Sequence, residues 1–380
     1  MSLTASLERL AAFEPAPYPV VSLYLNTQPG TQGRDQYQAF IRKEFKARSR
    51  TYPAGSPERE SLDRDLEKIA AYLEAEVQPS ANGVAIFACS AGELFETIQV
   101  PVPVDQHWLH IGDQPHLYPL ARLESRYPGY AAVVTDTNTA RILVFATGQV
   151  VKERDVKGVK TRQTTQGGWS QARYQRHITN FHSQHAKEVV ETLERVVQQE
   201  GITQILLSGD EVITPLLREQ MPKHLAVKVV DHLRLEAHAS TADVVKASLE
   251  AMARLNERSD REKVDAAVDA YRAGGLGVVG PEDTLDALVK GQVDELLIAG
   301  TLSEMRPVGA SGSANDAALS EPVIPAASAG EPAAAEPEVV RLADELVTKA
   351  KQTSAQITVI EDPALLAPYG GVAALLRFRI

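Results

Sequence analysis

The stretch QGGWSQARYQRHITNFHSQHAKEVVETLERVVQQEGITQILLSG, residues 166–209, decides the fold of the central part of the chain. It opens with two adjacent glycines, continues as a helix from about Gln171 to Gln199, and ends in Ile202–Ser208, an apolar run that predicts a buried strand. Before it, Ala131–Thr135 and Ala140–Thr147 are apolar runs joined by a short polar turn, which predicts a β-hairpin. Strands that alternate with helices in this way indicate an α/β layer structure.

Further elements of the same kind lie on both sides of this stretch. On the N-terminal side we expect a helical stretch through Phe40 and Phe45 and a second helix over Leu62–Val77, with apolar residues at helical spacing. The strands expected there are Val20–Asn26, Val84–Cys89 and Phe95–Val100. On the C-terminal side we expect helices over Pro215–Gln220, Thr241–Arg261, Glu262–Ala273, Thr284–Lys290 and Val340–Thr353. The strands expected there are Ala226–Val230, Glu295–Ala299, Ile357–Ile360 and Leu375–Ile380.

The length of 380 residues fits two or three domains, and the pattern of elements divides into three blocks. We predict an N-terminal α/β domain over 1–126, a middle domain with the Gly-Gly loop over 127–260, and a C-terminal domain over 261–380. Residues 303–338 are rich in Ala, Pro, Ser, Gly and Glu and poor in large apolar side chains. Such a composition buries too little surface to offset the entropy of ordering, so we predict a flexible insertion within the third domain.

The composition excludes several classes of protein. No run approaches the roughly 18 apolar residues of a membrane span, and the N-terminus has no basic region followed by an apolar run. We therefore expect a cytoplasmic protein without a membrane partner. Cys89, the single cysteine, lies in the apolar run GVAIFACS, which predicts a buried, inert thiol and no cysteine metal cluster.

The charge distribution points to a local contact with phosphate. The net charge of −11 argues against a protein that coats nucleic acid. Residues 151–176 nevertheless carry seven lysine and arginine residues and only two acids. A solvated loop is the simplest explanation of such a run, but an acidic chain with one basic segment also suggests a focused phosphate contact.

Inside this basic segment, Gln166–Arg176 combines features that suit an RNA-directed loop. Gly167 and Gly168 allow another molecule to approach the main chain closely. Gln171 offers an uncharged donor and acceptor, and Arg173 and Arg176 share one face of the following helix at i and i+3.

The segment resembles the Gly-Gly-Gln loop and the following Arg-aromatic-x-Arg helix of the archaeal and eukaryotic class-1 release factor/Pelota superfamily. The resemblance is colinear over essentially the whole chain. It is most specific at Gly280–Leu288 (GPEDTLDAL), followed by Glu295–Ile298, and at the closing Tyr369–Phe378. Earlier correspondences are Val20–Leu25, Asn82–Ala88 and Leu206–Gly209.

The resemblance implies a three-domain release-factor-like architecture. The middle domain would be ribonuclease-H-like, and the third an α/β sandwich resembling an RNA-binding ribosomal protein. The implied activity is hydrolysis of the ester that joins peptide to tRNA, on the ribosome and without a cofactor or metal. The implied partners are the ribosome and tRNA; a translational GTPase is a further candidate, because the third domain docks one in relatives.

The chain departs from the family pattern at the loop. Without gaps, Gly167 and Gly168 match the family glycines, but Trp169 takes the place of the catalytic glutamine and Gln171 lies two residues later. The eukaryotic tRNA hydrolases of ribosome quality control also carry a displaced glutamine. The first domain lacks an Asn-Ile-Lys-Ser decoding loop; its basic counterpart near Lys46–Tyr52 is different, so we expect action independent of the codon.

The resemblance thus assigns roles residue by residue. Gly167, Gly168 and Gln171 are the predicted catalytic residues: the glycines let the loop enter the peptidyl-transferase centre and Gln171 orients water. The predicted RNA-binding residues are Lys160, Arg162, Trp169, Arg173, Arg176 and His177. Trp169 would stack on a base or, equally well, pack the loop onto its own domain.

Three alternatives stay open at this stage. A non-catalytic ribosome-binding rescue or hibernation factor would keep the fold without the hydrolysis. A nuclease would rest mainly on Asp136, one acid after a strand, which is too little for a metal site. His177, His182 and His185 could bind a metal, although histidines that face solvent or RNA are the simpler expectation. Asp210 is expected to be no more than a loop or helix cap.

Overall fold

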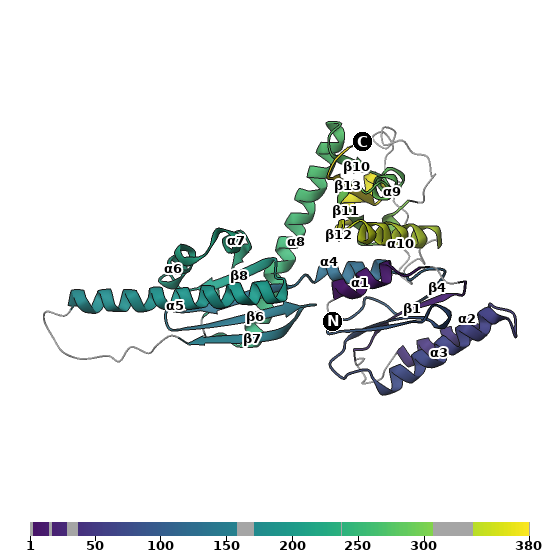
Figure 1. The fold of residues 1–380 in the computed structure, drawn as a ribbon, viewed down its shortest axis with the longest axis horizontal. Helices are drawn as coiled ribbons and strands as arrows, with labels where there is room; N and C mark the ends of the chain where they lie inside the picture. Colours follow the sequence, from purple (N-terminus) through teal and green to yellow (C-terminus); the bar gives the residue numbers. More distant parts are fainter. Residues whose placement is uncertain are drawn as a thin grey trace, which may run out of the picture. The chain divides into compact units, whose positions relative to one another are not determined.

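The computed structural model describes residues 3–14, 17–28, 37–157, 171–236, 238–306 and 337–379; side chains are described in these ranges except at 171–179, Glu304 and Pro337. The described chain is a mixed α/β protein with three sheets. It divides into two compact units, one made of Met1–Arg126 with Glu257–Ile380 and one made of Tyr127–Asn256 (Figure 1). We call them unit 1 and unit 2. The predicted three-domain boundaries stay a prediction.

Unit 2 is a five-stranded sheet between two helical layers. The strands, in the order β7-β6-β5-β8-β9, are β5 (Tyr130–Thr135), β6 (Thr139–Ala146), β7 (Gln149–Lys157), β8 (Gln204–Gly209) and β9 (Val229–His232). One face is covered by α5 (Gln171–Glu200), α6 (Ile213–Gln220) and α7 (Lys223–Ala226). The other face is covered by the first part of α8 (Thr241–Arg272).

The alternation of side chains along the strands explains this arrangement. In β5, Ala131 and Val133 point to the α5 layer, whereas Ala132 and Val134 point to the α8 layer. Successive strand residues face opposite sides of a sheet, so a strand buried on both faces is apolar at nearly every position. The predicted β-hairpin is confirmed, because β5 and β6 pair antiparallel, and β8 then joins β5 in parallel.

Two predictions in unit 2 differ from the structure. The strand expected over Ala226–Val230 is present with shifted limits, as β9 (Val229–His232), because the amides of Leu225 and Ala226 donate to the carbonyl of Pro222 and place Ala226 in the helical turn α7. The polar run at the start of the basic segment was expected to be a loop. It is strand β7, which pairs antiparallel with β6.

The N-terminal sheet of unit 1 has the order β3-β2-β1-β4. Its strands are β1 (Val20–Asn26), β2 (Gly83–Cys89), β3 (Leu94–Val100) and β4 (Trp108–Gly112). Helices α2 (Tyr37–Ser49) and α3 (Pro57–Ala75) cover one face, onto which β1 directs Val21 and Leu23. From the opposite face Tyr24 donates to the carbonyl of His116, just before α4 (Tyr118–Arg126). Helix α1 (Leu3–Ala11) contacts α4 and strand β3.

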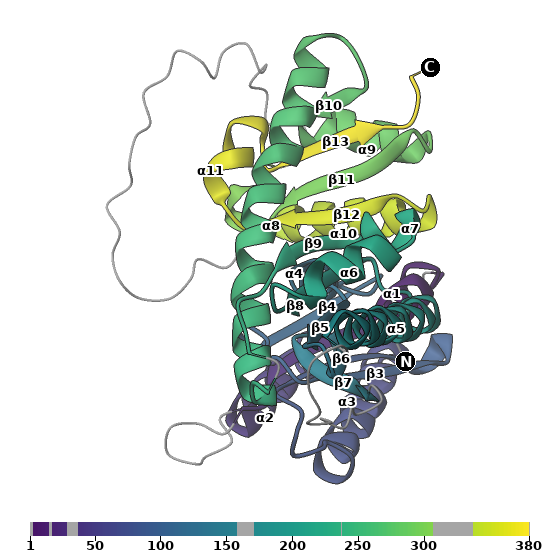
Figure 2. The ribbon, with the colours of Figure 1, turned by 90° about the vertical axis from the view of Figure 1, so that its left-hand side faces the viewer.

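The C-terminal sheet of unit 1 has the order β10-β13-β11-β12. Its strands are β10 (Gly277–Val279), β11 (Val293–Ala299), β12 (Gln356–Ile360) and β13 (Val372–Leu376). The end of α8 and α11 (Pro363–Leu366) pack on one face. The other face meets α9 (Pro281–Val289) and α10 (Pro337–Gln352), and Figure 2 shows α8 in front of these strands with α9 and α10 behind.

Two boundaries here differ from prediction. The helices expected over Thr241–Arg261 and Glu262–Ala273 are one helix, α8, because no glycine or proline interrupts the run. The last strand ends at Leu376 rather than continuing to the C-terminus.

The two sheets of unit 1 are joined through α4. The Ser125 hydroxyl accepts a hydrogen bond of 2.9 Å from the amide of Val359, on the edge strand β12. Arg122 forms a two-point ion pair with Glu361 and also contacts Asp105. An edge strand exposes unpaired backbone groups, so a helix laid beside it satisfies part of that edge. Residues far apart in the chain thereby share one compact unit.

Candidate nucleic-acid interface

The predicted RNA-directed loop connects β7 to α5 in unit 2. Residues 158–170 lie outside the described residues, and with them Lys160, Arg162, Gly167, Gly168 and Trp169. Gln171 is the first residue of α5, and Arg173, Arg176 and His177 follow within its first two turns. The side chains of these four residues also lie outside the described part. The arrangement of the predicted site side chains therefore stays a prediction.

Helix α5 is nevertheless well anchored beyond this region. Its buried side chains, which belong to the core against β5, β6 and β8, are Ala186, Val189, Val190, Leu193, Val196 and Val197. At its far end Glu200 pairs with Lys152 of β7. Residues 171–180 precede all of these contacts and, at 1.5 Å per residue, correspond to about 15 Å of helix. Figure 1 shows α5 running past the end of the sheet at its Gln171 end.

Strand β7 contributes described cations on the approach to the loop. Its acid Glu153 is neutralised by Arg141, and Lys152 by Glu200. Arg154 and Lys157 are exposed and form no ion pair with any residue that the structure describes. With the exposed Asp155 between them, these two cations leave a small net positive charge on the strand that leads into residues 158–170, which suits a phosphate contact.

The histidines of α5 do not all face outward. His182 is half-buried, but His185 is only 2% exposed and contacts the protein interior, so the expectation of a surface or RNA-facing His185 was wrong. The spacing along the helix explains why His185 is buried. His185 lies one turn before Val189 and so extends the buried stripe that also includes Ala186 and Val190. Among the described residues, no three His, Cys, Asp or Glu side chains are grouped to hold a metal ion.

The two acids that follow strands in unit 2 cap turns. Asp136 Oδ1 accepts from the amides of Asn138 and Thr139, both at 2.7 Å, and these hydrogen bonds lower the pKa of Asp136 although burial opposes them. Asp210 Oδ1 accepts from the amides of Val212 and Ile213 at 2.9 and 2.8 Å, which confirms the predicted cap. Asp136 therefore has a structural role in its own turn.

Sequence reasoning missed a polar cluster in unit 1. Asp344 of α10 is buried and accepts from the amides of Leu117 and Tyr118 and, at 2.7 Å, from His116 Nδ1. His116 is fully buried, and its Nε2 has no partner among the described residues. The two residues are 228 positions apart, so no local pattern could have revealed the pair.

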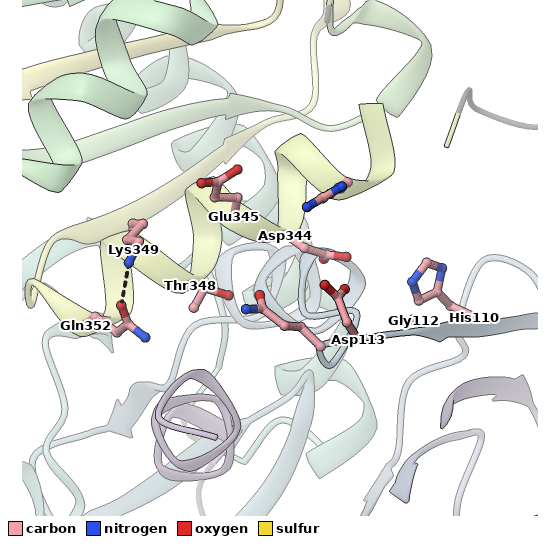
Figure 3. Close-up of a pocket in the computed structure, with 10 residues that line it drawn as sticks. His110, Gly112, Asp113, Asp344, Glu345, Thr348, Lys349 and Gln352 are labelled. Carbon is pink, nitrogen blue, oxygen red and sulfur yellow. Dashed lines mark hydrogen bonds between the residues drawn. The ribbon is translucent and has the colours of Figure 1, made fainter. Parts of the chain in front are cut away.

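Beside this cluster lies a pocket of about 390 Å³. Figure 3 shows Asp344, Thr348, Lys349 and Gln352 along α10, with His110 and Asp113 on the side of β4. Asp113, Asp344 and Glu345 supply three carboxylates to the lining, and Arg341 and Lys349 supply two cations. Because the charges nearly balance, the lining favours neither an anion nor a cation. Burial is the main cause of the lowered pKa of His110 on its wall.

The remaining physical properties agree with the composition. No helix among the described residues is long and apolar enough to cross a membrane. Cys89 is a free, buried thiol whose pKa is raised chiefly by burial, as predicted.

These observations define a class of protein, namely one with an α/β unit in which a glycine-containing basic segment precedes a long helix. The family model described as bacterial archaeo-eukaryotic release factor family 10 matches residues 115–253. This range includes α4, all of unit 2 except its last residues, and the whole predicted loop. Residues 115–253 are thus similar to this bacterial release-factor-like family, in line with the resemblance in the sequence.

The chain is also similar to a mycobacterial protein and to three solved structures. The uncharacterized protein Rv2629 of Mycobacterium tuberculosis is 24% identical over 277 residues, which are 71% of each chain. Among solved structures, the archaeal translation termination factor aRF1 is 18% identical, with 100% of this chain and 99% of that chain covered and a TM-score of 0.27. Saccharomyces cerevisiae Dom34 is 10% identical, with 75% and 73% covered and a TM-score of 0.45. Ribosome-bound archaeal Pelota is 13% identical, with 99% and 94% covered and a TM-score of 0.42.

Proposed function

We propose that this protein is a ribosome-associated, codon-independent peptidyl-tRNA hydrolase. The family match over residues 115–253, which includes the segment Gln166–Arg176, carries the proposal. Gly167 and Gly168 would let the loop enter the peptidyl-transferase centre, and Gln171 would orient the water that attacks the ester. The protein would act in the cytoplasm on ribosomes and tRNA, and a translational GTPase is a further candidate partner.

The position of Gln171 at the start of a 30-residue helix supports this mechanism. The first amides of a helix have no partner within the helix and carry partial positive charge. They therefore favour a developing oxyanion or a phosphate close to Gln171. Arg173, Arg176 and His177 follow in the same helix and, with Lys160, Arg162 and Trp169, would hold tRNA or ribosomal RNA.

One observation favours a second candidate function, a non-catalytic ribosome-binding rescue or hibernation factor. Trp169 stands where the family carries its catalytic glutamine, and an indole cannot orient water as an amide does. In this case the loop and the cations would bind the ribosome without cleaving the ester. The two candidates differ in the role they give to Gln171.

Release of labelled peptide from stalled ribosome–nascent chain complexes tests the proposal, with ribosome binding measured by sedimentation. Gln171→Ala should lower the release rate by about 100-fold, the loss typical of removing a positioned polar group, and leave binding intact. Gln184→Ala is a matched control, because Gln184 is exposed on the same helix and contacts Glu188. Equal release by wild type and Gln171→Ala would exclude the role given to Gln171. Binding without any release would establish the non-catalytic factor, and failure to bind ribosomes would overturn both.

A further inference from the structure

His185 is a buried titratable group on the helix that carries the predicted loop. Its side chain is in the core between α5 and the sheet, with 2% of the residue exposed. Neither Nδ1 nor Nε2 has a hydrogen-bond partner among the described residues. Most buried polar side-chain atoms are hydrogen-bonded, so an imidazole with both nitrogens unpartnered is an exception that calls for a reason.

The groups around His185 are already engaged with one another. The Thr139 carbonyl at the start of β6 accepts from the Asp136 amide at 2.9 Å, and the Thr135 hydroxyl lies 3.0 Å from it and 3.0 Å from the Asp136 carbonyl, so the two carbonyls compete for one hydroxyl proton. Asp136 Oδ1 is held by the amides of its own turn, and Oδ2 is 3.9 Å from His238. A second proton on His185 would therefore have to compete for acceptors that this turn already uses, and neither ring nitrogen has a hydrogen bond to a described residue.

Burial is the main cause of the lowered pKa of His185, and His182 on the same helix acts in the same direction. The charges of Asp136 and Glu188 and the Thr139 carbonyl oppose the shift without cancelling it. The folded protein thus holds the ring neutral more strongly than water does. As the pH falls below the ordinary imidazole pKa of about 6.5, protonation favours states in which His185 has left the core.

We propose that His185 is a proton-sensitive contact that weakens the packing of α5 on the sheet in mildly acidic conditions. The contact works because α5 meets the β5–β6 turn through a side chain that can be charged and has no partner there. For function, this inference rests on the proposed role of the loop at the start of α5. Loosening the helix would reduce the precision with which it holds Gln171, so hydrolysis would fall with the pH.

Amide hydrogen exchange of α5 tests the proposal without ribosomes, so its failure is distinguishable from failure of the proposed hydrolysis. Exchange in residues 185–200, corrected for the intrinsic pH dependence, gives the opening constant of the helix. A pH of 6.0 avoids the isoelectric point near 5.4. Between pH 8.0 and pH 6.0 the opening constant of the wild type should rise by up to about fourfold, the limit for one imidazole with a pKa of about 6.5 outside the core.

His185→Leu removes the titrating group while filling the core, so its opening constant should not change with pH. His185→Gln, which also cannot be charged, repeats the test if the leucine variant folds poorly. His182→Leu is the matched control on the same helix and should keep the response of the wild type. The proposal is overturned if His185→Leu responds to pH as the wild type does, or if the response disappears in His182→Leu and persists in His185→Leu.

Discussion

Replacing Asp344 should destabilise unit 1 far more than replacing the exposed Glu345 beside it on α10. Asp344→Ala leaves the amides of Leu117 and Tyr118 and the Nδ1 of His116 without their acceptor. The Asp344 side chain is 10% exposed and that of His116 is fully buried, so solvent cannot fully replace the carboxylate. Removing one member of such a buried pair costs about 3–5 kcal/mol. We expect a loss of this size in the free energy of unfolding.

Asp344→Asn separates the charge from the hydrogen bonds. The amide oxygen can still accept from the backbone of Leu117 and Tyr118, and the amide nitrogen can donate to His116 Nδ1 if the proton moves to Nε2. Hydrogen bonds to a neutral acceptor are weaker than those to a carboxylate, so the loss should be about 1–2 kcal/mol. Glu345→Ala is the control, because the exposed Glu345 follows directly on the same helix and should change stability by about 0.5 kcal/mol or less.

Trp108 provides a local probe for this experiment. Its ring lies 5.0 Å from that of His116, between centroids, and the chain has one other tryptophan, Trp169. In a Trp169→Phe background the fluorescence during urea unfolding reports on unit 1 alone. If Asp344→Ala unfolds at the same urea concentration as Glu345→Ala, the buried pair contributes little and the reasoning is refuted.

Three further predictions concern single positions in either unit. Gly277→Ala would place a Cβ 2.3 Å from the carbonyl oxygen of Ala267, so thermal unfolding should reveal a loss of about 1–3 kcal/mol, and an unchanged melting temperature would contradict this close approach. Asp210→Ala removes the acceptor of two amides at the start of α6 and should cost about 0.5–2 kcal/mol, with faster amide exchange in that helix and not in α5. Burial raises the pKa of Asp260 to about 6, above its value in the unfolded chain, so the ionised carboxylate lowers the stability of the folded state at higher pH. Asp260→Asn should therefore raise the melting temperature at pH 8, with a gain that shrinks as the pH falls through about 6; a gain independent of pH would exclude ionisation as its cause.

Local patterns predicted the elements whose stability is local. VVSLYLN predicted β1 with its observed limits, because a strand buried on both faces must be apolar throughout. The edge strand β7 (QVVKERDVK) was missed because its charged residues pair with Arg141 and Glu200, so its sequence lacks an apolar face. Helix α4 was missed because its N-terminal amides are capped by Asp344, far along the chain. Residues that depend on distant partners carry no signal of them in their own neighbourhood.

In the candidate site, too, features that depend on local sequence were predicted and features that depend on distant partners were not. The start of a helix at Gln171 was predicted from the local sequence and is observed. The burial of His185 was not, because spacing alone gave it the same status as His182, one turn earlier. The β5–β6 turn, which comes nearly fifty residues before it in the sequence, decides that one histidine is covered and the other is not. The roles of the predicted catalytic and RNA-binding residues stay predictions.

The limits of the family match do not coincide with the limits of unit 2. The match begins at residue 115, whereas unit 2 begins at Tyr127. The intervening residues include His116, Tyr118 and Arg122, which bind Asp344, the carbonyl of Ala299 and Glu361 in the C-terminal part of unit 1. The segment that the family model matches therefore includes both most of the loop-bearing unit and the helix that joins the two sheets of unit 1. A fragment cut at residue 115 would carry α4 without the partners that cap and pair it, so tests of hydrolysis should use the full chain.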